Sequence, residues 1–370
     1  MIPETIRLRR EEQATFRLRQ LYEAYGYAQY KMSKFEEYDL YVRNKSFLVS
    51  DNVITFTDTN GRLMALKPDV TLSIVKNTKD TPGARRKVYY NENVYRVAGS
   101  SRAFKEILQT GLECIGAVDD YAIAEVLSLA RESLALISPD HMLNVSHLGI
   151  LSDVLDRVGV SPDGRTALLG HIGHKNRHDA EAVCNAEGIP PARRAPLGAL
   201  MAICSAPREA LEALAALYDD DAWRARIAQL SRILSVLPGE RVRLDFSVVN
   251  DMNYYSGLVF QGFVNGIPES ILSGGQYDRL MERMGHSAAA VGFAVYLSHL
   301  EALEEAPSAY DVDTVLLYDA DTPPDALLGA VRALTAEGVT VSAQRSLAPK
   351  QRARRVLRWQ AGELKEVTSC

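Results

Sequence analysis

The sequence has few of the features that mark disulfide-bonded, metal-binding or membrane-spanning proteins. Its four cysteines are scattered without a C-x-x-C pair, so neither a disulfide framework nor a zinc ribbon is indicated. One of its most apolar stretches, residues 195–204, is far shorter than the roughly 20 residues that a membrane helix needs. Residues 1–7 lack the apolar core of a signal peptide. We therefore expect a protein of the reducing cytoplasm.

An excess of positive charge is also absent. The chain carries 42 Lys and Arg against 47 Asp and Glu, a formal net charge of -5, which gives no global attraction to a nucleic acid backbone. The basic run at residues 350–355 is a local exception, and we interpret it as a solvated helix face rather than an RNA contact. Neither a Gly-x-Ser-x-Gly elbow nor a Walker loop occurs, so the sequence does not support an α/β-hydrolase or a P-loop nucleotide-binding protein.

Three histidines are the one pattern that invites a metal interpretation. His171, His174 and His178 have i, i+3 and i+7 spacing, which predicts that they share one face of a helix. No H-E-x-x-H pattern accompanies them, and Gly173 weakens the helix. We interpret them as a polar helix face and predict no metal site.

The length and the periodicity predict an α+β protein of two or three domains. The chain has 370 residues, against roughly 150 for one domain, and its 47% hydrophobic and 24% charged residues are typical of a globular protein. Helical spacing predicts helices over 9–26 and 121–137. Short apolar runs predict strands, which are residues 46–49, 53–56, 87–90, 112–116, 242–248, 258–260 and 291–294.

Composition divides the rest of the chain. Residues 163–238 are rich in alanine, leucine and arginine, show no strand pattern, and are predicted to be a helical insertion. Residues 1–162 and 239–305 would then form one core. A βαβ-like pattern starts after the linker at 304–308, so residues 309–370 are predicted to be a small α/β unit.

Several ordered segments together resemble the histidyl-tRNA synthetase family, which includes the regulatory subunit of ATP phosphoribosyltransferase as a paralogue. The segments are 66–71 (LKPDVT), 94–96 (VYR), 109–113 (QTGLE), 253–260 (NYYSGLVF), 273–278 (SGGQYD) and 290–294 (AVGFA). The resemblance covers about 5–302. It implies a class II aminoacyl-tRNA synthetase-like antiparallel sheet flanked by helices, a homodimer formed through the N-terminal helix and strand, and a truncated anticodon-binding-like unit at 309–370.

The resemblance also implies a histidine-binding site. Histidine needs a carboxylate for its ammonium, a cation or amide for its carboxylate, and a carboxylate or hydroxyl for its imidazole N–H. By position in the motifs, Asp69 and Thr71 resemble the ammonium side, and Arg96 and Gln109 the carboxylate side. The residues that resemble the imidazole side are Glu113, Tyr255 and Tyr277.

One of these assignments depends on strand geometry. If residues 254 and 255 lie in a strand, their side chains face opposite sides, so only one reaches a ligand. We favour Tyr255 over Tyr254.

The same motifs lack the cations that adenylation requires. A pentavalent α-phosphate gathers negative charge that fixed cations must stabilise, and losing one such donor costs roughly 3 to 4 kcal/mol. Where the synthetases carry arginines, this chain has Asn250, Gln276 and His299. The resemblance therefore favours a subunit without catalytic residues of its own.

The resulting hypothesis is a non-catalytic regulatory subunit of ATP phosphoribosyltransferase, required for the first step of histidine biosynthesis and for feedback by histidine. The resemblance implies the short-form catalytic subunit as its partner, with a homodimer inside a hetero-oligomer, and no cofactor. Two alternatives stay open: a histidyl-tRNA synthetase with a reduced C-terminal domain, and a stand-alone histidine-binding or tRNA-related paralogue.

Overall fold

The computed structural model describes residues 8–48, 53–97, 103–237, 239–249, 254–303, 309–360 and 362–367. The chain divides into two compact units, of which one spans Arg10–Leu303 and the other contains the C-terminal strands. Within the described ranges, no helix is both long and apolar enough to cross a membrane.

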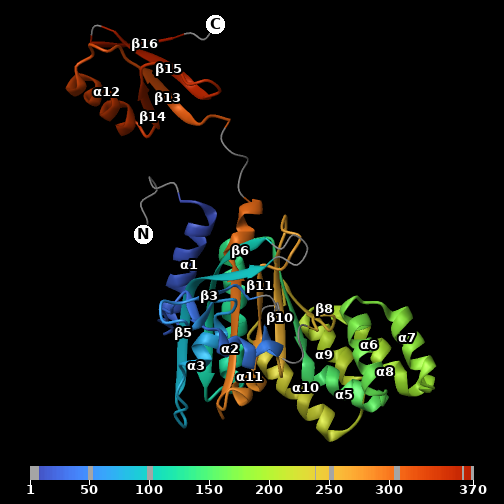
Figure 1. Ribbon diagram of the computed structural model, residues 1–370. Helices are drawn as coiled ribbons and strands as arrows, with labels where there is room; N and C mark the ends of the chain where they lie inside the picture. The colour runs from blue at the N-terminus through green and yellow to red at the C-terminus, as the bar shows by residue number, and fades with distance from the viewer. Residues whose placement is uncertain are drawn as a thin grey trace. The chain divides into compact units, whose positions relative to one another are not determined.

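A nine-stranded sheet organises the larger unit (Figure 1). Its order is β1-β5-β6-β12-β11-β10-β7-β9-β8, and the six strands from β5 to β7 pair with one another antiparallel, whereas β1 pairs with β5 and β9 with β7 in parallel. The strands are β1 (Ala28–Gln29), β5 (Arg85–Val97), β6 (Phe104–Gly116), β7 (His141–His147), β8 (Cys204–Ser205), β9 (Val242–Asp245), β10 (Leu258–Val264), β11 (Leu272–Gln276) and β12 (Ala289–Tyr296).

Helices α1 (Arg10–Ala24) and α4 (Asp120–Ile137) cover one face of this sheet. The apolar stripe of α1, which includes Leu18 and Tyr22, packs in one core with α4 and with alternate sheet residues such as Leu112 and Phe293. Tyr22 is fully buried and its hydroxyl lies 3.0 Å from Ser133 Oγ of α4. Because neighbouring strand residues point to opposite faces, the residues between these apolar positions face the other side of the sheet.

Shorter elements lie against that other face. They include a three-stranded sheet, in the order β2-β4-β3, and a second core formed with parts of β5 and β6. These elements are β2 (Phe35–Glu37), α2 (Tyr38–Arg43), the 3-10 helix η1 (Lys45–Phe47), β3 (Thr55–Thr57), β4 (Leu63–Leu66), α3 (Thr71–Lys76) and α11 (Asp278–Arg283).

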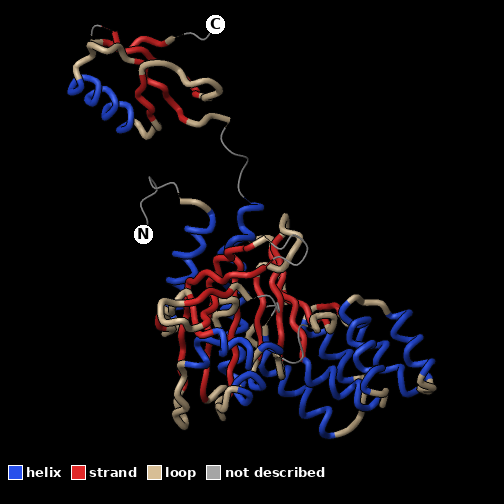
Figure 2. The backbone as a smooth tube through the Cα atoms, in the orientation of Figure 1, coloured by secondary structure: helices blue, strands red, loops and turns tan. Residues whose placement is uncertain are grey.

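A group of helices follows β7 along the chain and lies beside the β8 edge of the sheet (Figure 2). They are α5 (Leu148–Val158), α6 (Pro162–Gly173), α7 (Arg177–Ala186), α8 (Pro191–Ala202), α9 (Pro207–Ala215) and α10 (Asp221–Leu234). The prediction that 163–238 contains no strand is wrong at Cys204–Ser205, which pairs with β9 as strand β8. A two-residue strand is too short for periodicity to reveal.

The C-terminal unit is a four-stranded sheet in the order β14-β13-β15-β16, with one helix packed against it. The elements are β13 (Val312–Leu317), α12 (Pro324–Ala336), β14 (Val341–Gln344), β15 (Ala353–Gln360) and β16 (Glu363–Glu366). The parallel pairing of β13 with β14 across α12 confirms the predicted βαβ unit.

One local prediction fails between the first helix and strand β5 of the sheet. Residues 46–49 were predicted to be a strand, but Lys45–Phe47 forms a 3-10 helix, and its Phe47 packs in the second core. The run that contains Phe47 is short and buried, and an apolar run of this length does not distinguish a strand from a helical turn. At the end of the larger unit, residues 297–303 form the 3-10 helix η2 (Leu297–Leu303).

Candidate functional site

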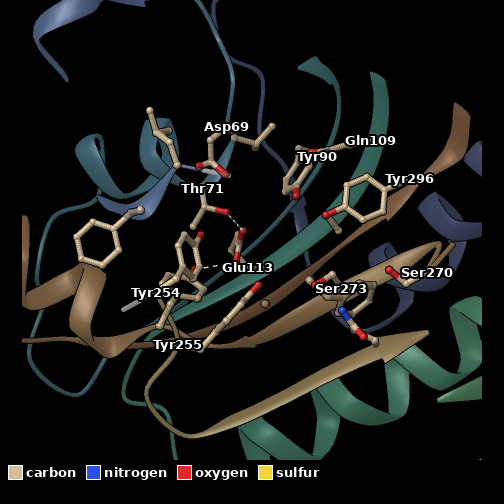
Figure 3. Close-up of a pocket in the computed structure, with 18 of the residues that line it drawn as sticks. Asp69, Thr71, Tyr90, Gln109, Glu113, Tyr254, Tyr255, Ser270, Ser273 and Tyr296 are labelled. Atoms are coloured by element: carbon tan, nitrogen blue, oxygen red, sulfur yellow. Dashed lines mark hydrogen bonds between the residues drawn. The ribbon is translucent and has the colours of Figure 1, made fainter. Parts of the chain in front are cut away.

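A cavity of about 440 Å³ lies between the sheet and the shorter elements that cover it (Figure 3). Its floor comes from alternate residues of β5, β6, β12, β11 and β10, and its cover from residues near η1, α3 and α11. Side chains that line it include Phe47, Asp69, Thr71, Tyr90, Arg96, Gln109, Glu113, Tyr254, Tyr255, Gln261, Ser270, Ser273, Tyr277 and Tyr296.

All seven residues that the motifs assigned to histidine binding line this one cavity. Strand β6 shows how they are placed: Gln109 and Glu113 are four residues apart and therefore share a face, while Leu112 and Cys114 point into the opposite core. Asp69 lies just before α3, where its Oδ1 accepts a hydrogen bond from Leu72 N at 2.8 Å.

Glu113 is the most unusual group in the cavity. Its side chain is 2% exposed, and it accepts hydrogen bonds from Thr71 Oγ1 (2.8 Å) and Tyr277 OH (2.7 Å). Burial raises the pKa of Glu113 to about 8; the two hydroxyl donors work against this rise, and the nearby charge of Asp69 adds to it. In the described part of the chain no cation forms an ion pair with it. Glu113 is thus a desolvated carboxyl whose two hydrogen-bond donors are both hydroxyl groups.

Asp69 and Arg96 carry opposite charges on the cavity wall. Burial raises the pKa of Asp69, while the hydrogen bond from Leu72 N and the positive charge of Arg96 act in the opposite direction. Arg96 Nε donates to Pro68 O at 3.3 Å, which ties the guanidinium to the segment that carries Asp69. A zwitterion with one ammonium and one carboxylate matches this pair of charges.

Aromatic side chains form the wall next to Glu113. Tyr254 and Tyr255 pack edge to face with ring centroids 4.7 Å apart, and Tyr254 also lies 6.0 Å from the Tyr277 ring. Strand alternation was the reason for favouring Tyr255 over Tyr254 as the one that reaches a ligand, but both residues line the cavity. They precede β10, so the alternation of a strand does not apply to them.

Gly292 on β12 allows Glu113 to occupy its position. A Cβ on Gly292 would lie 1.8 Å from Glu113 Oε2 and 2.5 Å from Leu112 O. No side chain fits there without displacing the carboxyl, so this glycine is required by the close approach of Glu113.

Gln276 and His299, which stand where the synthetases carry arginines, make contacts outside the cavity. Gln276 is not among the residues that line the cavity; its Oε1 accepts a hydrogen bond from Leu258 N at 2.8 Å. The His299 ring stacks on Tyr296, with centroids 5.6 Å apart and an interplanar angle of 25°. Asn250 lies outside the described residues.

Two other sequence patterns, the three histidines and the basic run at 350–355, are not among the residues that line the cavity. The three histidines do not share a helix: His171 is in α6, His174 caps its end and His178 is in α7, because Lys175 adopts a positive φ of 53° between the helices. No group of three His, Cys, Asp or Glu side chains suited to a metal occurs within the described ranges.

The basic run at 350–355 is not a helix face, since β15 begins at residue 353. Its arginines contact acceptors near or on the neighbouring strand β13: Arg352 pairs with Asp311 (3.4 Å) and Arg354 with Asp313 (3.8 Å). This pairing offsets the positive charge of the run.

Several lining residues were missed from the sequence, namely Tyr90, Tyr254, Gln261, Ser270, Ser273 and Tyr296. The sequence contains a pattern that predicts Tyr296 as a lining residue, because it continues the period-two series of Gly292 and Ala294 along one strand. Gln261 and Ser273 face each other across β10 and β11, and this register is not visible before the strands are paired.

Comparison with known proteins identifies the family. The histidyl-tRNA synthetase family matches residues 3–300 of the chain. The chain belongs to this family. Among its relatives, the ATP phosphoribosyltransferase regulatory subunit of Oceanobacillus iheyensis is 27% identical over 319 residues, which are 83% of this chain and 78% of the relative. The resemblance inferred from the motifs is thereby confirmed.

Solved structures share the fold of this histidyl-tRNA synthetase family member. A Bacillus halodurans C protein, described as an ATP phosphoribosyltransferase regulatory subunit/histidyl-tRNA synthetase, has a TM-score of 0.75 at 22% identity and covers 94% of this chain and 93% of its own. The ATP phosphoribosyl transferase (HisG:HisZ) complex from Thermotoga maritima contains a chain with a TM-score of 0.61 at 20% identity, covering 78% and 97%. These matches confirm the predicted class II synthetase-like fold.

Proposed function

We propose that this chain is a regulatory subunit of ATP phosphoribosyltransferase that binds histidine in the cavity and catalyses no reaction itself. The names of its relatives support the role, and the Thermotoga maritima complex supports a catalytic chain as its partner. The proposal extends to a homodimer inside a hetero-oligomer with the short-form catalytic subunit, in which histidine acts as the feedback inhibitor.

The observation that carries the ligand assignment is Glu113. A carboxyl buried against two hydroxyls and no cation keeps acceptor capacity that a ligand N–H can satisfy. An imidazole N–H supplies such a donor, while Asp69 takes the ammonium and Arg96 with Gln109 takes the carboxylate.

The loss of adenylation rests on the positions that replace the synthetase arginines. Gln276 is neutral and spends its amide oxygen on the backbone of β10, so it offers no cation to a phosphate. His299 packs its ring on Tyr296 and lies outside the residues that line the cavity. With neither position supplying a fixed cation, the developing charge of an adenylation transition state is left without two stabilising donors.

Regulation requires that histidine distinguish two states of the complex. A ligand shifts an equilibrium only by the difference in its affinity for the two states, and this coupling is reciprocal. Histidine must therefore bind more tightly to the inhibited complex than to the active one.

Reconstitution tests the role directly. A mixture of the chain with a short-form catalytic subunit should transfer the phosphoribosyl group from phosphoribosyl pyrophosphate to ATP. The catalytic subunit alone should be less active than this mixture. No stimulation at any ratio of the two chains would contradict the proposal.

Exchange of labelled pyrophosphate into ATP tests the alternative of a synthetase. With histidine and ATP present, the purified chain should show no exchange above a sample without histidine. Rapid histidine-dependent exchange would instead establish the synthetase function.

A further inference from the structure

Tyr296 forms the wall of the cavity beside Arg96 and Gln109. It is the last residue of β12 and lies directly across from Gln109 of β6 in the sheet. Figure 3 shows its ring at the side of the cavity away from Thr71, with the hydroxyl turned inward. A ligand carboxylate held by Arg96 and Gln109 would therefore meet this ring.

Contacts of both the ring and the backbone of Tyr296 fix its position. His299 stacks on it at 5.6 Å, and the His299 Nε2 atom lies 3.7 Å from Glu269 Oε2. The backbone is tied as well, since Tyr296 N donates to Ile271 O at 2.8 Å. Helix η2, which carries His299, is held to β6 by a hydrogen bond from Leu108 N to Ser298 Oγ at 2.9 Å. A ring stacked and anchored in this way does not swing aside without breaking contacts.

The hydroxyl of Tyr296 has a second role. It lies next to the Arg96 guanidinium, whose positive charge opposes the rise that burial causes in the pKa of Tyr296, and the Arg96 Nε atom is bonded to Pro68 O. Two contacts on one guanidinium restrict its rotation and leave its remaining donors for a ligand. Tyr296 thus both limits the space beyond the carboxylate site and orients the cation in it.

We infer that Tyr296 determines specificity by admitting a free amino acid and excluding ligands extended at the carboxyl group. The inference rests on the proposed binding of histidine. The stacked ring occupies the space that an added residue in amide linkage, or an ester group, would need, and the hydroxyl holds Arg96 for a free carboxylate.

Calorimetry with two probes tests this inference on the full chain. Histidine is compared with the dipeptide histidylglycine, which keeps the ammonium and imidazole but extends the carboxyl end. The wild type should bind histidine at least tenfold more tightly, because overpacking a closed wall is costly. Tyr296→Ala should reduce this ratio about tenfold by removing the ring.

Two further variants separate the ring from the hydroxyl. Tyr296→Phe keeps the stacked ring, so it should keep the ratio while weakening histidine binding about threefold or more through the lost contact with Arg96. Tyr121→Ala removes an exposed tyrosine of α4, 63% exposed, and should match the wild type for both probes. If Tyr296→Ala does not fold, Tyr296→Val is judged by the same tenfold criterion.

The outcomes distinguish this inference from the proposed function. A wild-type ratio near one, or an unchanged ratio in a folded Tyr296→Ala variant, overturns the inference while leaving histidine as the ligand. Failure of the wild type to bind histidine at all, alone or with the catalytic subunit, would instead refute the histidine assignment on which the inference rests.

Discussion

Replacing Glu113 by glutamine should change how stability depends on pH. The carboxyl is 2% exposed and burial raises its pKa to about 8, compared with 4.5 for an unperturbed glutamate. A proton is therefore bound by the folded state and not by the unfolded state between these two values. The stability that comes from the neutral form is fully present below pH 4.5 and is lost as the pH rises through about 8.

The size of the effect follows from the two pKa values. Their difference corresponds to about 5 kcal/mol, with a slope of up to about 1.4 kcal/mol per pH unit between them. Glutamine keeps the shape and an amide oxygen that can accept from Thr71 or Tyr277, but it does not ionise. The free energy of unfolding of Glu113→Gln, minus that of the wild type, should therefore rise by several kcal/mol from pH 5 to pH 9.

Urea unfolding followed by tryptophan fluorescence measures this difference. The chain has two tryptophans, and a Trp359→Phe background leaves the fully buried Trp223 to report on the larger unit. Glu301→Gln, at an exposed carboxyl, is the matched control and should track the wild type at each pH. A difference between Glu113→Gln and the wild type that stays constant within about 1 kcal/mol from pH 5 to pH 9 would refute the reasoning.

Three further substitutions probe the site and its support. Asp69→Ala should weaken histidine binding about tenfold or more, since a hydrogen-bonded charge is lost; unchanged affinity in calorimetry would remove Asp69 from the site. Gly292→Ala should cost about 1–3 kcal/mol of stability in urea and also weaken histidine binding, because its Cβ would overlap Glu113; wild-type values for both would contradict the geometry. Lys67→Met should cost about 3–5 kcal/mol in the same assay, because Lys67 is buried with its Nζ atom 3.0 Å from Glu92; a loss under 1 kcal/mol would show that the pair contributes little.

The sequence predicted the long elements of the fold well. Helix α1 was expected over 9–26 and spans Arg10–Ala24, and α4 was expected over 121–137 and spans Asp120–Ile137. In both helices the apolar residues recur over four or more turns, which is enough for a 3.6-residue period to be distinguished from alternation. The 3-10 helix at Lys45–Phe47 covers a single turn, and its form depends on packing that local sequence does not encode.

The cavity was predictable only in part. The ordered motifs named seven residues that the fold brings to one cavity, although they come from segments far apart in the chain. Strand alternation predicts that only one of Tyr254 and Tyr255 reaches a ligand, but both residues precede β10. Gln261 lies on β10 and Ser270 in the loop before β11, and both reach the cavity only because these two strands pair. Residue identity indicated the chemistry, whereas the register of β10, β11 and β12 decided which further side chains complete the wall.

Feedback inhibition in the reconstituted complex tests the central claim most directly. Phosphoribosyl transfer by the short-form catalytic subunit is measured with the wild-type chain and with Glu113→Gln, over a titration of histidine. The account predicts that both chains stimulate transfer and that histidine inhibits the wild-type complex but is at least tenfold less effective on the variant. Equal inhibition of the two complexes by histidine would contradict the claim that this cavity is where the chain senses it.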